Sequence, residues 1–183
     1  MRMPKVWPLL MAGSIGAMGG PAVAADTHQL LIGSYTQGTS QGIYRLSFDS
    51  QTGLLDAKPL QVIKSENPSW LTLSRDQRRL FVVNENGPGQ QDPVGRVSSF
   101  AIDPTSHELS LISQVQSLGN EPTHSSLSAD ASHLFVSNYS VAEDPGGTLA
   151  VLPVGADGKL GPVVQMSSHP SSRVNPERQM SAH

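Results

Sequence analysis

Residues 68–74 read PSWLTLS and residues 79–85 read RLFVVNE. The pattern returns 54 residues further along the chain, where residues 122–128 read PTHSSLS and residues 133–139 read HLFVSNY. Each copy consists of two short strand-like segments joined by a polar turn. A self-match at this spacing is typical of repeat architectures, in which every copy is one structural unit and neighbouring units share a continuous core.

Each repeated unit holds about four candidate strands, which is the content of one β-propeller blade. A third strand at residues 42–49 has counterparts at residues 95–103 and, more loosely, at residues 147–154. Turn-forming pairs follow these strands, and each leads through a leucine into a fourth, outer segment. The pairs are Thr52-Gly53, Ser106-His107 and Asp157-Gly158, and the leucines are Leu55, Leu109 and Leu160.

The predicted fold is therefore all-β, a β-propeller of four-stranded antiparallel blades. The first unit begins at residues 30–35, which match a second strand, so another segment must supply its innermost strand. Because a closed ring needs at least four blades, we expect here about three blades of a ring of about seven. A natural three-bladed protein and a ring closed by several copies are the alternatives. The predicted blades span about 28–64, 67–116 and 121–167, and residues 168–183 form a loop into a fourth blade.

The composition fits a turn-rich globular β protein. Hydrophobic residues make up 37% of the 183 residues, and the chain contains 17 glycines and 14 prolines, which argues against a helical bundle. The net charge of −3 offers no basic stripe to neutralise phosphates, so no nucleic-acid partner is expected. Because the chain contains no cysteine, neither a disulfide nor a thiolate zinc cluster can form within it.

The N-terminal residues have the pattern of a secretory signal peptide. Arg2 and Lys5 precede an apolar run at residues 6–18, and small residues follow at 22–24, as signal peptidase requires. The run is too short and too often interrupted by glycine and proline for a stable membrane anchor. We therefore predict an exported protein, periplasmic or secreted, with a signal peptide at 1–25, cleavage near Ala24 or Ala25, and a propeller domain at 26–183.

Several short motifs are shared with a known group of proteins. They are Ile32-Gly33-Ser34-Tyr35-Thr36, Asn67-Pro68-Ser69-Trp70-Leu71, Val83-Asn84-Glu85, Glu121-Pro122-Thr123-His124 and Ser137-Asn138-Tyr139. Together they resemble the lactonase family of seven-bladed β-propellers, whose best-known activity is that of 6-phosphogluconolactonase. The resemblance implies a lactone hydrolase that opens a sugar-type lactone by water attack. It also implies a small-molecule lactone as partner and no cofactor.

Two other functions are compatible with the resemblance. The same family includes fungal enzymes that cyclise carboxymuconate, a reaction close to the reverse of lactone opening. A noncatalytic propeller that serves as a binding scaffold in the cell envelope is the second alternative, because one ring hosts many unrelated functions. Export argues against a phosphogluconolactone substrate, since sugar phosphates of central metabolism are cytosolic, while a lactone stays the expected substrate class.

Lactone hydrolysis needs an activated water, donors for the developing oxyanion and a proton source for the departing ring oxygen. A propeller brings such groups together at the mouth of its channel, where loops and inner-strand ends converge. His124 begins a predicted innermost strand and can act there as base or oxyanion donor, while its counterpart one unit earlier is Trp70. The alternative for His124 is a side chain satisfied by a neighbouring backbone carbonyl.

Two further residues carry suitable chemistry. Glu85 ends a second strand beside an apolar segment and suits a general base, although a solvated carboxylate in the following loop is the alternative. Arg178 lies in a polar stretch without strand periodicity. Its guanidinium can pair bidentately with a substrate anion, whereas most arginines in such loops are merely solvated. Asn84 and Asn138 recur at equivalent positions, which favours a structural role for both.

The resemblance thus assigns catalytic roles to Glu85, His124 and Arg178. It assigns substrate-binding roles to Asn138, Tyr139, Gln179 and His183. No metal site is expected, because the remaining histidines do not pair at metal-ligand spacing. The oligomeric state stays open. Three blades on their own are expected to be inactive, since an incomplete channel wall leaves the substrate-binding groups unsupported.

Overall fold

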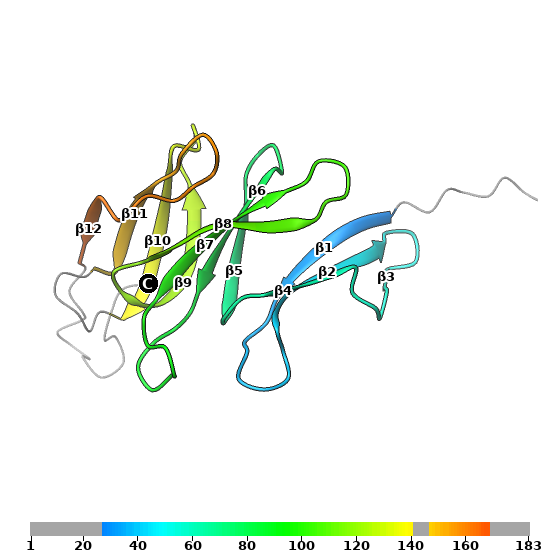
Figure 1. Ribbon diagram of the computed structural model, residues 1–183, viewed down its shortest axis with the longest axis horizontal. Coiled ribbons are helices and arrows are strands. Elements are labelled where there is room, and N and C mark those ends of the chain that lie inside the picture. Colours follow the sequence, from blue (N-terminus) through cyan, green and yellow to red (C-terminus); the bar gives the residue numbers. More distant parts are fainter. Residues whose placement is uncertain (1–26, 141–146, 169–183) are drawn as a thin grey trace, which may run out of the picture.

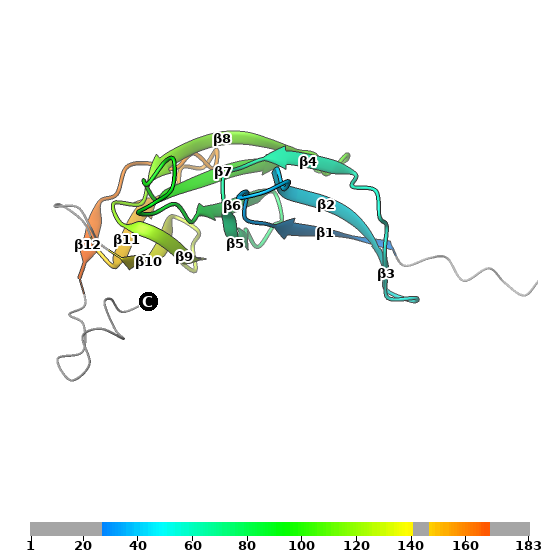
Figure 2. The same cartoon turned by 90° about the horizontal axis from the view of Figure 1, so that it is seen from below.

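The computed structural model describes residues 27–140 and 147–168, and every regular element in this part of the chain is a β-strand (Figure 1). The strands pair antiparallel into three four-stranded sheets that follow one another along the molecule (Figure 2). The all-β prediction is therefore confirmed. Among these residues no helix exists that could cross a membrane. The predicted signal peptide lies outside the described residues.

Twelve strands follow one another along the described residues. They are β1 (Thr27–Gly33), β2 (Gly42–Asp49), β3 (Leu54–Leu55), β4 (Gln61–Lys64), β5 (Pro68–Leu73), β6 (Arg79–Asn84), β7 (Arg96–Ile102), β8 (Leu109–Gln116), β9 (Asn120–Leu127), β10 (His133–Ser140), β11 (Leu149–Pro153) and β12 (Gln165–Ser167).

The second and third sheets repeat one up-and-down arrangement. The second sheet has the order β5-β6-β7-β8, and the third has the order β9-β10-β11-β12. Their central strands pair in the same way, with Leu80 opposite Phe100 in one sheet and Leu134 opposite Leu152 in the other. The sequence repeat therefore corresponds to equivalent strands of two consecutive sheets.

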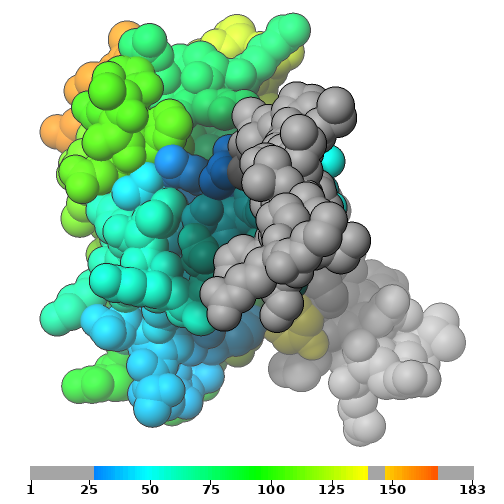
Figure 3. Space-filling view, turned by 90° about the vertical axis from the view of Figure 1, so that its right-hand side faces the viewer, coloured from blue at the N-terminus to red at the C-terminus, as the bar shows by residue number. Residues whose placement is uncertain are grey.

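The first sheet has no counterpart of β5 and β9 among the described residues. β1 pairs with β2 and so takes the place that β6 and β10 hold in the other sheets. The outer edge of β2 pairs with β4 at one end and with β3 at the other. Figure 3 views this side of the molecule, where an open groove of about 630 Å³ runs beside β1. Its walls include Leu30 and Leu31 of β1 and Leu71 and Leu73 of β5.

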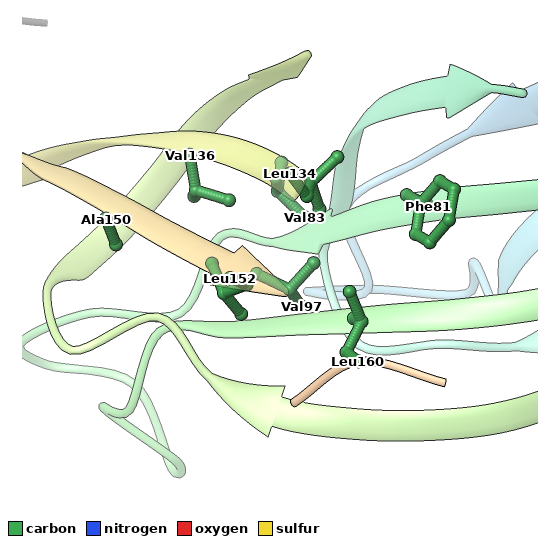
Figure 4. Packing of buried hydrophobic residues seen from close by; sticks show 8 residues of the cluster. All are labelled: Phe81, Val83, Val97, Leu134, Val136, Ala150, Leu152 and Leu160. Atoms are coloured by element: carbon green, nitrogen blue, oxygen red, sulfur yellow. The ribbon is translucent and has the colours of Figure 1, made fainter. Parts of the chain in front are cut away.

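Alternate side chains of β6 point into two different cores. Leu80 and Val82 pack toward the first sheet, whereas Phe81 and Val83 pack toward the third sheet (Figure 4). All four are at most 1% exposed, and a strand covered on both faces requires such a continuous apolar run. The first core consists of Ile43, Leu80, Val82, Phe100 and Leu109; the second consists of Phe81, Val83, Val97, Leu134, Val136, Ala150, Leu152 and Leu160.

The inner strands of neighbouring sheets lie side by side. Trp70 Nε1 and Thr72 Oγ1, both on β5, donate hydrogen bonds to the backbone carbonyl of Ser125 on β9, at 3.1 Å and 2.9 Å. The second and third sheets thus stack face to face with their first strands adjoining, as neighbouring propeller blades do.

Truncation of Phe81 tests the shared core. We expect Phe81→Ala in the complete protein to lower the free energy of unfolding by about 3–5 kcal/mol, because it leaves a cavity between two sheets. Leu54→Ala is the matched control, since Leu54 is 67% exposed and its truncation should change stability by less than about 0.5 kcal/mol. Urea unfolding followed by circular dichroism measures both, and equal effects would contradict the stacked-sheet core.

Candidate active site

Glu85 and Tyr139, two of the residues predicted to be functional, lie at one end of the three sheets. Neighbouring strands are antiparallel, so the ends of β6 and β10 lie beside the beginnings of β5 and β9. Tyr35, Glu85 and Tyr139 stand at equivalent places, at or just beyond the ends of β1, β6 and β10. This end of the sheets, with the adjoining faces of β5 and β9, is the candidate active site.

Buried asparagines hold the chain at this end. The amide of Asn84 donates to the carbonyl of Glu66 at 2.5 Å and accepts a hydrogen bond from the Ser98 hydroxyl at 2.7 Å. Asn138, its counterpart, is fully buried and donates to the carbonyl of Gly147 at 2.9 Å. Both side chains tie a strand end to a neighbouring loop. Because Asn138 has no exposed surface, it can influence a substrate only through the backbone that it binds at Gly147.

Glu85 is half-buried and is paired with a tyrosine of the preceding sheet. The hydroxyl of Tyr35 donates to Glu85 Oε2 at 2.8 Å. Burial of the phenol group, the hydrogen bond to Glu85 and the negative charges of Glu85 and Glu121 together raise the pKa of Tyr35 to about 12. The phenol therefore stays protonated at physiological pH and keeps donating to the carboxylate, which leaves the other carboxylate oxygen to accept a proton.

Glu121 brings a second carboxylate to the same place. The negative charge of Glu121 contributes to the raised pKa of Tyr35. Its side chain occupies the space that a Cβ atom at position 87 would need, and Gly87 leaves that space open. The backbone of Glu121 is left-handed, with φ at 54°, and Asn67 at the equivalent position has φ at 38°. This conformation is uncommon for residues other than glycine, especially before a proline. It turns the chain at the start of each inner strand.

His124 lies on β9 and contacts a ring of the neighbouring sheet. Its imidazole is exposed, and its ring centroid is 4.4 Å from that of Trp70, with the two ring planes inclined by 47°. Trp70 occupies the corresponding place on β5, so the pair joins equivalent positions of consecutive inner strands. An exposed imidazole on an inner strand can exchange protons with a bound molecule.

The other residues of the prediction have different places. Tyr139 is 43% exposed at the end of β10. Arg178, Gln179 and His183 lie outside the described residues. Within the part of the chain that the structure describes, no group of three or more His, Asp or Glu side chains is arranged to hold a metal ion.

The family resemblance predicts roles for Glu85 and His124 but not for their partners. Tyr35 and Glu121 had appeared only as parts of motifs, and Trp70 only as the counterpart of His124. The one signal that relates Tyr35 to Glu85 is their equivalent place in consecutive repeats. That signal becomes informative only when the sheets are known to stack with equivalent ends together.

Stacked four-stranded antiparallel sheets of this kind define a propeller-type protein. A family model described as "Lactonase, 7-bladed beta-propeller" matches residues 29–183. The chain belongs to this lactonase family of seven-bladed β-propellers. The resemblance predicted from its motifs is therefore confirmed.

Three known proteins similar to this chain have lactonase names. The solved structure of a periplasmic gluconolactonase from Pseudomonas aeruginosa superposes with a TM-score of 0.75 at 53% sequence identity, covering 82% of this chain and 41% of that one. A 6-phosphogluconolactonase of Bacillus subtilis is 29% identical over 152 residues, which are 83% of this chain and 40% of the relative. One from Formosa agariphila is 28% identical over 156 residues, 84% of this chain and 41% of the relative. The chain thus spans about two fifths of the length of these relatives.

The pKa of Tyr35 provides a test of the carboxylate cluster. We expect the Tyr35 phenol to remain protonated at about pH 11, where ordinary tyrosines with a pKa of about 10 are mostly ionised. Glu85→Gln should lower this pKa, because a neutral amide removes a charge that disfavours the phenolate. NMR of ¹³C-labelled tyrosine, with Tyr35→Phe for assignment, follows the titration. A Tyr35 signal that titrates with the ordinary tyrosine pKa of about 10 in the parent protein would refute the cluster.

Proposed function

We propose that the protein of which this chain forms part hydrolyses a sugar-type lactone. The observation that carries the proposal is the 53% identity, across 82% of this chain, to a periplasmic gluconolactonase. The local chemistry supports it, because a carboxylate with a fixed donor lies at the end of β6 and an exposed imidazole lies on β9, the inner strand of the next sheet. These are the groups that water attack on an ester carbonyl requires.

In the proposed mechanism Glu85 acts as the base and His124 as the proton donor. In the alternative assignment the two groups exchange these roles. The carboxylate takes a proton from water as the water oxygen bonds to the lactone carbonyl carbon, and the carbonyl π electrons move to its oxygen. Collapse of this oxyanion breaks the bond to the ring oxygen, which receives a proton from the imidazole. The product is the open-chain sugar acid.

Two supporting roles complete the proposed site. Tyr35 orients Glu85 by its hydrogen bond to Oε2, so the reacting carboxylate oxygen has a defined direction. Arg178 is proposed to stabilise the oxyanion, since negative charge that develops beside two carboxylates needs a cation close by. Tyr139, Gln179 and His183 are proposed to contact the substrate hydroxyl groups, and Asn138 is proposed to support them through its hydrogen bond to the Gly147 carbonyl.

Charge at the site favours an unphosphorylated substrate. Glu85 and Glu121 both act electrostatically on Tyr35, and a phosphate dianion placed near them would be repelled. One relative is named for gluconolactone and the Bacillus relative for 6-phosphogluconolactone. We therefore propose a neutral sugar lactone as the substrate.

We also propose export to the periplasm, followed by removal of residues 1–25. The charged start and the apolar run of the N-terminal segment support this, as does the periplasmic location in the name of the Pseudomonas relative. A substrate without phosphate agrees with that compartment, because sugar phosphates are cytosolic metabolites.

Substitution of the two proposed acid–base groups tests the mechanism. In the complete protein, Glu85→Gln and His124→Ala should each lower kcat for D-glucono-1,5-lactone by about 100-fold or more, as loss of general acid–base catalysis does. Stability should change by less than about 1 kcal/mol, because neither side chain belongs to a hydrophobic core. A pH-stat assay with the lactone and its 6-phosphate measures rate and substrate preference together.

Glu108→Gln is the control for this experiment, since Glu108 is an exposed carboxylate in the turn between β7 and β8, at the opposite end of the second sheet. Its activity should match that of the parent. If both Glu85→Gln and His124→Ala retain full hydrolysis, the mechanism fails although the fold stands. A parent protein that hydrolyses neither lactone would contradict the proposed function itself.

The export proposal has its own measurement. We expect the protein expressed from its complete gene to appear in the periplasmic fraction, with an intact mass that lacks about 25 N-terminal residues, as signal peptides of this length are removed on secretion. Replacement of the apolar run at residues 6–18 by polar residues should keep the protein in the cytoplasm at full length. Export of that variant would contradict the proposed role of the segment.

A further inference from the structure

Trp70 and His124 face each other across the boundary between the second and third sheets. Their ring centroids are 4.4 Å apart, and they lie opposite Val83 of β6 and Ser137 of β10. Both side chains are exposed, Trp70 by 42%. Since the inner strands of a propeller line its channel, the aromatic pair forms part of the wall that a bound molecule meets.

The indole of Trp70 is anchored independently of His124. Its only polar group, the Nε1–H, donates to the backbone carbonyl of Ser125, and the Thr72 hydroxyl donates to the same oxygen. The strand that carries His124 therefore fixes the orientation of the indole plane. With its donor used, the exposed remainder of the indole is an apolar, rigid surface next to an imidazole.

A sugar lactone ring is complementary to such a surface. Hydroxyl groups project around the rim of a pyranose-type ring, while its C–H bonds form an apolar face. The negative face of an aromatic ring attracts these partly positive hydrogens, and contact removes apolar area from water. The open-chain acid formed by hydrolysis no longer holds its C–H groups in one rigid face, so it makes this contact less well.

We propose that Trp70 is a specificity-determining residue that stacks on the C–H face of a sugar lactone ring and so binds the closed ring beside His124. The inference rests on the lactonase function proposed above and adds the group that distinguishes a closed ring from an open chain. It also explains how the site releases its product, because ring opening removes the stacking partner of the indole.

Binding of a ring and of an open chain tests this role. The probes are D-glucono-1,5-lactam, a ring in which nitrogen replaces the reactive ring oxygen, and D-gluconate, which is open. Calorimetry on the complete protein should show that Trp70→Leu weakens lactam binding by about tenfold, the effect of losing one aromatic contact with its buried area. Gluconate binding should change less than about twofold. Trp70→Phe, with a smaller ring, should fall between parent and Trp70→Leu.

Kinetics give a second readout of the same variants. Trp70→Leu should raise KM for D-glucono-1,5-lactone by about tenfold and change kcat by less than about threefold, because stacking acts equally on the bound lactone and on the transition state. Thr72→Val is the matched control. It removes the other donor to the Ser125 carbonyl but keeps the indole, so lactam and gluconate should bind to it as they bind to the parent.

The outcomes separate the inference from the proposed function. Equal weakening of lactam and gluconate by Trp70→Leu, or the same loss in Thr72→Val, would show that Trp70 only supports the strands and would overturn the inference. A parent protein that binds no lactam would overturn it as well. A third outcome is a parent protein that binds the lactam through Trp70 but hydrolyses no lactone. That result would support the role of Trp70 in ring binding and would refute only the lactonase function.

Discussion

Burial of β6 on both of its faces is the constraint on which the described structure depends. Leu80 and Val82 belong to one core and Phe81 and Val83 to another. Removal of either neighbouring sheet would therefore expose apolar surface of this strand. A single four-stranded sheet has two faces to cover and little interior of its own. Face-to-face stacking covers the apolar face of each sheet with the next sheet. It also fixes the order of the sheets and the alignment of their ends.

The candidate site follows from that alignment. Tyr35 and Glu85 are 50 residues apart in the chain, and Trp70 and His124 are 54 apart. Each pair joins equivalent positions of consecutive units, which face-to-face stacking brings together. Core positions of the repeat must stay apolar in every copy. Positions at the inner strands and strand ends carry no such packing demand, so they can differ between copies and hold unlike chemical groups.

The geometry of the candidate active site depends on the backbone as much as on the side chains that face solvent. Asn84 and Asn138 hold loops at the ends of two second strands, and both are fully buried. Asn67 and Glu121 take left-handed backbone conformations at the starts of two inner strands. These features place Glu121 over Gly87 and close to the Tyr35–Glu85 pair. A carboxylate pair close to one phenol is therefore a product of backbone geometry.

The amino-acid sequence by itself determined the strands, their order and the family. Alternation of apolar residues is a local pattern, and its return after 54 residues reveals equivalent units without any knowledge of their arrangement. Glu85 and His124 could be proposed because both lie in motifs that resemble the lactonase family. Only the tertiary structure decided that Tyr35 holds Glu85 and that Trp70 contacts His124. Such contacts depend on the spacing and rotation between neighbouring sheets, which arise from packing of whole faces and leave no mark in a local stretch of sequence.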